Sequence, residues 1–309
     1  RQGWDVAPGQ VANFYNPLFY VPFYYLVSAV PPILAGFIIG ALQGLNGAIL
    51  VEIARDMCAR VKPQERRWVP GLMAVLALTG AGFVWELGTS FGDTILSVFI
   101  LLCLWINLRA VGYWGAVLHR FAWAMVCLTG LLAGAVAGLK QPFAMYAVGL
   151  CGAFLVISGQ WWRNVAIAFV FGVAVLLGMS ATAGFWFTEL WQRYGNPLFP
   201  YFNEVFQSPW AWLGPYRDER FLPKSALDAF LFPFTFITEP FHSGETPFRD
   251  ARIATWYIVL FIFLGTVIVR LVRPVGHAVR SVPADLRYLT VFLVLSLGAW
   301  LKLFSIYRY

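Results

Sequence analysis

The sequence has few charged residues. Only 12% of its 309 residues are Asp, Glu, Lys or Arg, whereas 60% are hydrophobic and 18% are aromatic. A soluble domain carries roughly 25% charged residues, so this composition excludes an ordinary soluble domain and predicts a polytopic membrane protein. The formal net charge of +7 does not indicate a nucleic-acid partner, because the positive charges are spread over short segments between apolar runs. Membrane orientation explains such a distribution better.

Cysteine and histidine are also scarce, and this excludes several kinds of site. The four cysteines stand singly in or beside apolar runs, without a CxxC spacing. We therefore expect neither a disulfide framework nor a zinc site. The three histidines, His119, His242 and His277, all lie outside the middle of the apolar runs, so a histidine pair that ligates haem in the bilayer is not expected.

The apolar runs predict an all-α transmembrane fold, a polytopic helical bundle with about eight spans. Ile33 to Ile53 is the first, and its Gln43 and Asn46 are expected to face other helices, since lipid offers them no hydrogen-bond partner. Several runs are shorter than the roughly 20 residues needed for a crossing, so flanking charges must snorkel. The other spans are expected at Val69 to Trp85, Thr94 to Leu108, Phe121 to Leu139, Pro142 to Gln160, Asn164 to Thr188, Ile253 to Val269 and Tyr288 to Ile306.

Four regions follow from this reading. Residues 1–32 form an extracytoplasmic loop in which Asn16 to Val30, rich in Tyr and Phe, is predicted to be a short helix in the membrane interface. Transmembrane helices fill 33–188 and 253–309, and a large extracytoplasmic loop spans 189–252. Because Arg1 is not a start residue and Tyr309 follows an apolar run directly, we expect the chain to be incomplete at both ends.

Basic residues set the expected orientation. Five of them, between Arg55 and Arg67, fall in one short loop, which is typical of the cytoplasmic side. With alternating spans, the inner loops collect a charge of +8 and the outer side a charge of −1, which agrees with the net charge of +7. Midplane positions are almost free of charge, and this argues against an ion-coupled transporter.

The turn ELGTSFGD holds the first candidate site. Glu86 and Asp93 lie at its two ends, between two apolar runs. Carboxylates close to a bilayer are costly and tend to mark function, so this pair could bind a cation or act as a base toward a hydroxyl. The alternative is that both are exposed turn residues, with Asp93 capping the helix that starts at Thr94.

Single cations at the expected outer helix ends form the second candidate site. Lys140 stands alone before a proline, and Arg308 has a similar placement. Either could meet a lipid-linked phosphate, and a helix start would add backbone N–H groups. The alternative reading of Lys140 is a snorkelling anchor.

The large loop is the third candidate site, because a loop of this length is unlike a mere connector. In PYRDERF, Arg217 and Arg220 could bind phosphate and Asp218 could bind sugar hydroxyls, although such neighbours usually form surface ion pairs. The same two readings, a phosphate- and sugar-binding pair or a surface ion pair, apply to Arg249 and Asp250. Trp and Phe residues of the loop could stack on a sugar ring or belong to an interfacial belt. They are Trp191, Phe202, Phe206, Trp210 and Trp212.

An ordered set of patches resembles a group of bacterial multi-spanning proteins that are similar to GT-C-type glycosyltransferases. The patches include GWDVAPGQVANFYNPLFYVPFYYL, ALQGLN, ELGTSFGD, AGLKQPFAMYAVGL, RYGNPLFPYFNEVFQSP and RDERFLP, and they cover nearly the whole chain. The resemblance implies a transmembrane bundle that transfers a sugar from a polyprenyl-phosphate donor to a glycan or lipid acceptor. The reaction would occur at the outer face of the inner membrane. In such enzymes a carboxylate of the first outer loop commonly serves as base, and Asp5 is the residue in that region.

The reaction expected from these residues is an inverting transfer. Asp5, Glu86 or Asp93 would deprotonate the acceptor hydroxyl, and Lys140, Arg308 or an arginine of the large loop would offset charge on the departing phosphate. A divalent cation as cofactor is left open. Two other functions are also left open: a lipid-linked glycan polymerase or ligase, and a non-enzymatic subunit of a larger membrane complex.

Overall fold

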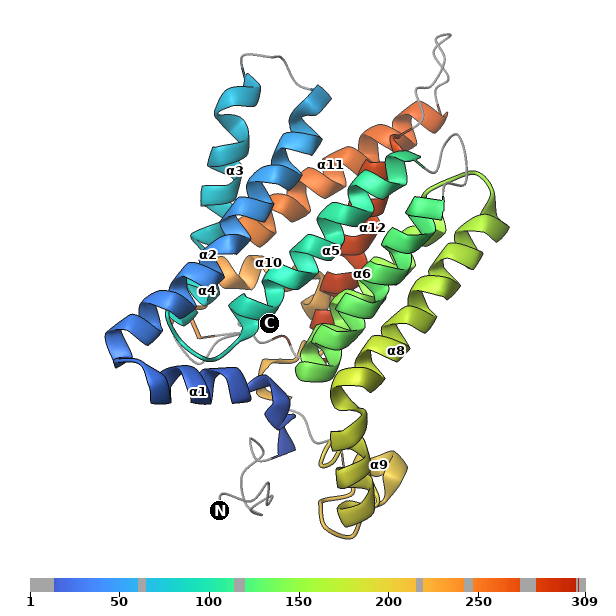
Figure 1. The fold of residues 1–309 in the computed structure, drawn as a ribbon. Coiled ribbons are helices and arrows are strands. Elements are labelled where there is room, and N and C mark those ends of the chain that lie inside the picture. The colour runs from blue at the N-terminus through green and yellow to red at the C-terminus, as the bar shows by residue number, and fades with distance from the viewer. Residues whose placement is uncertain are drawn as a thin grey trace.

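The computed structural model describes residues 14–60, 65–113, 120–214, 219–241, 247–272, 282–303 and residue 305. Within these ranges the chain forms helices and turns and no strand, which confirms the all-α prediction for this part of the protein. In Figure 1 the long helices run side by side as a bundle, and a short helix, α1 (Val21–Ala29), lies across one end of it. We call this end of the bundle the α1 end.

Five helices in the described ranges are long and apolar enough to cross a bilayer, as expected of an integral membrane protein. The prediction of about eight spans exceeds this number and stays a prediction, as does the orientation. The five helices are α2 (Pro32–Met57), α5 (Asp93–Tyr113), α6 (Arg120–Leu139), α8 (Trp161–Tyr194) and α12 (Ala284–Leu303).

The other three predicted spans are also helical, and two of them are interrupted. Residues 69–85, predicted as one span, are divided at Thr79 and Gly80 into α3 (Val69–Leu78) and α4 (Ala81–Glu86). Residues 142–160 contain α7 (Ala144–Ala153) between two 3₁₀ turns, η5 (Gln141–Phe143) and η6 (Phe154–Val156), and residues 253–269 lie in α11 (Arg252–Val272). The remaining elements are η2 (Pro17–Phe19), η3 (Cys58–Arg60), η4 (Glu65–Arg67), α9 (Asn203–Phe206), η7 (Glu219–Phe221) and α10 (Ala226–Thr238).

The predicted interfacial segment is helical and is tied to the bundle by Asn16. Its Nδ2 donates to the carbonyls of Gly138 and Thr182, at 2.9 Å each, and its Oδ1 accepts from the N–H of Leu18 at 3.0 Å. The first two bonds hold the segment on α6 and α8, and the third caps η2. Tyr24 and Tyr25 of α1 stay exposed, as aromatic side chains in a headgroup layer would be.

The region predicted as one large loop has more helix than expected. Helix α8 continues through Glu189 to Tyr194 and ends where Gly195 takes a left-handed φ of 66°. Nothing in the sequence before Gly195 breaks a helix, so the charge at Glu189 marks a change of environment and not a helix end. A further apolar helix, α10, lies inside the same region.

Close packing of α6 against α8 depends on glycine. A Cβ added at Gly178 would come within 2.0 Å of the Leu131 carbonyl, and one added at Gly134 would come within 2.0 Å of the Val175 carbonyl. The two backbones can approach this closely only because these positions lack side chains. Small residues at such crossings are the usual way in which helices associate in lipid.

We predict that Gly178→Ala destabilises the protein by about 1–3 kcal/mol, because its methyl group must push α6 away from α8. Gly184→Ala, on the same helix, is the matched control, since no atom lies within 4 Å of a Cβ built there. The measurement is the Tm of both variants in lipid nanodiscs. Equal Tm values for the two variants would contradict the packing described above.

Candidate functional site

Three of the predicted site residues come together at the α1 end. Glu86 is the last residue of α4 and Asp93 the first of α5, and their exposed fractions are only 2% and 5%. Lys140 follows the end of α6, and its Nζ lies 2.6 Å from Asp93 Oδ1. The same ammonium donates to the carbonyl of Phe91 at 3.0 Å. The side chain of Lys140 is 14% exposed, so this is a largely buried ion pair and not a snorkelling anchor.

The turn between Glu86 and Asp93 is held by a glutamine from α2. Gln43 Nε2 donates to the Glu86 carbonyl at 3.0 Å and to Thr94 Oγ1 at 2.8 Å, while its Oε1 accepts from Gly88 N at 2.7 Å. Gly88 has a φ of 77°, which favours glycine. Asn46 Nδ2 adds a bond to the Thr94 carbonyl at 2.6 Å. The prediction that Gln43 and Asn46 face other helices is therefore confirmed.

The N-terminus of α5 is capped by Glu86. Its Oε2 accepts from the N–H of Thr94 at 3.2 Å. Asp93 does not act as this cap, because its carboxylate is turned to the ammonium of Lys140, 2.6 Å from its Oδ1. The alternative reading, exposed turn residues with Asp93 as the cap, is thus wrong. The physical reason is the fold of the turn, which lays the carboxyl group of α4 over the unpaired N–H groups of α5.

The two carboxyl groups share an environment that favours one proton between them. Burial, the negative charge of Asp93 and a hydrogen bond with its side chain raise the pKa of Glu86 from 4.5 to about 8, in that order of size. The Thr94 N–H and the charge of Lys140 lower this pKa, but by less. A proton on Glu86 would let it donate to Asp93, and such pairs are typical of acid–base sites.

We predict that this carboxyl group makes stability depend on pH. The pKa of Glu86 is higher in the folded than in the unfolded protein, so the folded state binds more protons between pH 4.5 and about 8. The free energy of unfolding should therefore fall as pH rises through that window. The free energy of unfolding of the Glu86→Gln variant should fall less over the same window, because the amide keeps a donor toward Asp93 at every pH. Parallel pH profiles of Tm for the two proteins in nanodiscs would contradict this.

An apolar cavity of about 830 Å³ opens in the same half of the bundle, between α3, α7, α11 and α12. Tyr146, on its wall, also lies within electrostatic range of Asp93. Ser296, another lining residue, has a buried hydroxyl without a hydrogen-bond partner in the described part of the chain. The volume falls within the roughly 300–1,000 Å³ of small-molecule sites. The other lining residues are Met73, Leu76, Ala77, Met145, Ala251, Arg252, Ile253, Thr255, Trp256, Val259, Leu293, Leu297 and Trp300.

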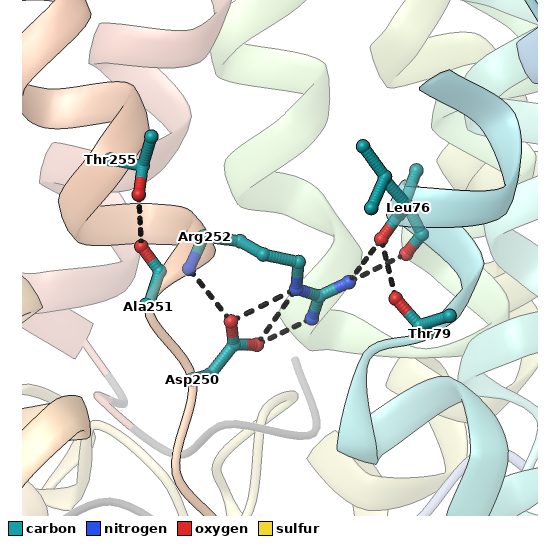
Figure 2. Close-up of polar contacts among 7 residues, drawn as sticks. Leu76, Thr79, Asp250, Ala251, Arg252 and Thr255 are labelled. Carbon is teal, nitrogen blue, oxygen red and sulfur yellow. Dashed lines mark hydrogen bonds and ion pairs between the residues drawn. The ribbon is translucent and has the colours of Figure 1, made fainter. Parts of the chain in front are cut away.

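Figure 2 shows how Arg252 fixes one wall of this cavity. Its Nη1 donates to the carbonyls of Leu76 and Ala77, at 2.9 Å each, which lack a helical N–H partner where α3 ends. The Leu76 carbonyl also accepts from Thr79 Oγ1 at 2.8 Å. Its Nε donates to both oxygens of Asp250, at 2.9 and 3.0 Å. Asp250 is only 7% exposed, whereas the Arg252 side chain is 35% exposed. The buried carboxylate thus holds a half-buried guanidinium that joins the start of α11 to the end of α3.

The sequence did not predict these contacts of Arg252 with Asp250, Leu76 and Ala77, which we call the Arg252 clamp. Both readings of the sequence paired Asp250 with its neighbour Arg249, whereas Asp250 is buried and pairs with Arg252, and Arg249 is exposed. The signal that was missed is the pair Thr79-Gly80, which marks a break inside the predicted span. Helix α3 ends before this pair and α4 begins after it. A helix end inside a bundle needs donors for its last carbonyl groups, and an arginine is the side chain best able to supply several.

We predict a strong coupling between Arg252 and Gly80. Arg252→Ala leaves Asp250 buried without its charge partner and should cost roughly 3 kcal/mol, at the low end for buried pairs because the arginine is 35% exposed. Gly80→Ala should also destabilise, since its Cβ would lie 2.4 Å from Arg252 Nη2, although its φ of −63° suits alanine.

The double variant tests whether the two costs have one origin. Once Arg252 is alanine, the methyl group at residue 80 meets no guanidinium, so Gly80→Ala should add little. Gly71→Ala in α3 is the control, because no atom lies within 4 Å of its added Cβ. Additive losses of Tm in the double variant would contradict the clamp.

The other predicted site residues are not brought to this cluster. Asp5, Arg217, Asp218 and Arg308 lie outside the described residues. Arg220, in η7, is exposed, and its guanidinium carbon lies 5.2 Å from the ring centroid of Phe221. Where the chain is described, no three His, Cys, Asp or Glu side chains gather as a metal site. A cation held by Glu86 and Asp93 therefore stays a prediction.

No protein-family model, curated protein or solved structure matches the chain. The resemblance to GT-C-type glycosyltransferases therefore stays a prediction, as do the membrane and the orientation. The cluster of Glu86, Asp93 and Lys140 and the apolar cavity, connected through Tyr146, are the features that bear on function.

Proposed function

We propose that the protein is a membrane glycosyltransferase that moves a sugar from a polyprenyl-phosphate donor to a glycan or lipid hydroxyl at the outer face of a bacterial inner membrane. The observation that carries the proposal is the buried carboxyl pair Glu86 and Asp93 with Lys140 at one end of the bundle, in the same half as an apolar cavity. A base, a cation and a place for a hydrocarbon chain are what this reaction requires.

The carboxyl pair supplies the base. Asp93 is the member paired with Lys140, so we assign it the role of accepting the proton from the acceptor hydroxyl. Glu86, with its pKa raised to about 8, carries a proton at neutral pH and donates a hydrogen bond to Asp93. General-base help of this kind contributes roughly 10²–10⁴-fold to a rate.

Bond changes in the proposed step occur in one displacement. The acceptor oxygen forms a bond to the anomeric carbon while the bond from that carbon to the phosphate oxygen breaks. The electron pair of the broken bond leaves with the polyprenyl phosphate, and the acceptor proton passes to Asp93. One displacement at the anomeric carbon inverts its configuration.

Lys140 and the cavity act on the donor. The Lys140 ammonium is held by Asp93 and the Phe91 carbonyl, so it is positioned before the reaction and needs little reorganisation to offset charge on the departing phosphate. The cavity of about 830 Å³ is lined mostly by apolar side chains and takes the part of the polyprenyl chain nearest to the phosphate.

We predict that Asp93→Asn and Lys140→Ala each reduce sugar transfer by about 10²–10⁴-fold, since each removes a group that acts on the reacting atoms. Glu86→Gln should retain most of the transfer, because its amide keeps the donor toward Asp93. The assay uses full-length protein in nanodiscs with labelled polyprenyl-phosphate sugars and a membrane extract as acceptor. Lys224→Ala is the control, because Lys224 is an exposed lysine in the segment after η7. Size-exclusion profiles would show that each variant is folded.

Several outcomes would overturn the proposal. Wild-type transfer by Asp93→Asn would remove the carboxyl pair from the reaction. Growth of long products in place of single-sugar addition would indicate a glycan polymerase or ligase. Absence of transfer from every donor, together with stoichiometric copurification of another membrane protein, would indicate a non-enzymatic subunit.

A further inference from the structure

The segment after α8 presents large apolar side chains on its surface. Phe202, Val205, Trp210, Trp212 and Leu213 are 51%, 69%, 70%, 68% and 61% exposed. We call residues 202–213 the aromatic knob. Glu204 is its single charged residue. Several exposed apolar side chains this close together mark a surface that contacts something other than water.

The knob is a fixed structure. Asn203 is fully buried at its centre, and its Nδ2 donates to the carbonyls of Ser208 at 2.9 Å and Ala211 at 3.0 Å. Its Oδ1 accepts from the N–H of Ser208 at 2.9 Å. These bonds close the segment on itself and keep Trp210 and Trp212 on the outside. The hydrogen bonds of Asn203 therefore fix the backbone in a conformation that leaves both indole rings exposed.

Helix α8 fixes the depth at which the knob lies. From Val165 to Phe187 the helix is free of charge, and 22 steps of about 1.5 Å give roughly 33 Å, close to the thickness of the hydrocarbon core. Trp161 and Trp162 precede this run and Trp191 follows it, and all three are exposed. Tryptophan on both sides of an apolar run is typical of the two headgroup layers.

The knob is attached at the second of these layers. The ring of Phe206 packs edge-on against Trp191, with centroids 6.2 Å apart. Figure 1 shows α9 at the end of α8, on the same end of the bundle as α1. Phe206 therefore places the attachment of the knob at the level of Trp191, about one helical turn beyond Phe187 and the charge-free run, where indole rings are favoured.

We propose that the aromatic knob is a membrane-surface anchor that inserts into the phospholipid headgroup layer. Its apolar side chains contact the upper acyl carbons, and the indole N–H groups of Trp210 and Trp212 bond to headgroup oxygens. Depth, the near absence of charge and the choice of tryptophan all favour lipid over a protein or a glycan. The inference uses only α8 and the knob, so it is independent of the proposed enzymatic function.

The test places a nitroxide label on the full chain in phospholipid nanodiscs. Single cysteines at Val205 and Trp212, in a background with the native cysteines replaced by alanine, are compared with one at Lys224, a charged and exposed position. We expect the labels at 205 and 212 to collide more often with oxygen than with a water-soluble nickel complex, and the label at 224 to show the reverse. Preference for nickel at both knob positions would overturn the proposal and leave a water-facing surface for a protein or glycan.

A second measurement covers the case in which labelling disturbs the fold. Tryptophan fluorescence of the unlabelled protein is quenched by lipids brominated near the headgroup, and Trp210→Ser with Trp212→Ser should lose part of the quenched amplitude. Trp105→Phe is the comparison, because Trp105 is partly buried and its Nε1 donates to Asp56 Oδ2 at 3.1 Å. An unchanged quenched amplitude in the double variant would overturn the anchor.

Discussion

The amide of Gln43 is the interaction on which the candidate site depends. Lipid cannot hydrogen-bond to a polar group, so a fully buried glutamine in a membrane helix must find its partners within the protein. Gln43 finds them in the turn after α4, through the carbonyl of Glu86, the hydroxyl of Thr94 and the N–H of Gly88. The cost of leaving this amide unpaired, about 1–3 kcal/mol per group, is what holds the turn in one conformation.

That conformation explains why a carboxyl pair can persist at the edge of a membrane. Two ionised carboxylates in a buried turn would repel each other, and one lysine offsets only one of them. The order of the effects on Glu86 decides the outcome, because burial and Asp93 together outweigh the Thr94 N–H and Lys140 and leave its pKa near 8. Near neutral pH the turn therefore holds the protonated carboxyl group of Glu86 beside Asp93, so that an acid and a base lie side by side. A carboxyl group that only capped a helix would be ionised at this pH.

Local pattern predicted part of this arrangement. The apolar runs predicted the helices, and the expense of a polar group in lipid predicted that Gln43 and Asn46 would face other helices. The nearness of Glu86 to Asp93 followed from the short turn between them. Their roles did not, because the choice of which carboxyl group caps α5 depends on the backbone path of the turn. Lys140 meets Asp93 only through the packing of α6 beside α5, and no sequence pattern records that distance.

Helix ends were the least predictable feature, for a related reason. A run of apolar residues specifies burial in lipid but not continuity of the helix. Residues 69–85 therefore read as one span, although Arg252, far along the chain, satisfies carbonyl groups at a break within it. The length of α8 was underestimated for the same reason. Glu189 ends the apolar run, but the backbone stays helical to Tyr194.

The break in the α3–α4 segment connects the clamp to the carboxyl pair. Helix α4 is only six residues long, and its first turn begins at Gly80, beside the guanidinium of Arg252. Its last residue is Glu86, whose backbone is bound by Gln43 and whose side chain caps α5. The end of α4 is thus bound by a side chain from α2, and Arg252 binds the end of α3 just before the break. Because only two residues separate α3 from α4, the contact that closes the cavity wall also places the start of the short helix that carries Glu86.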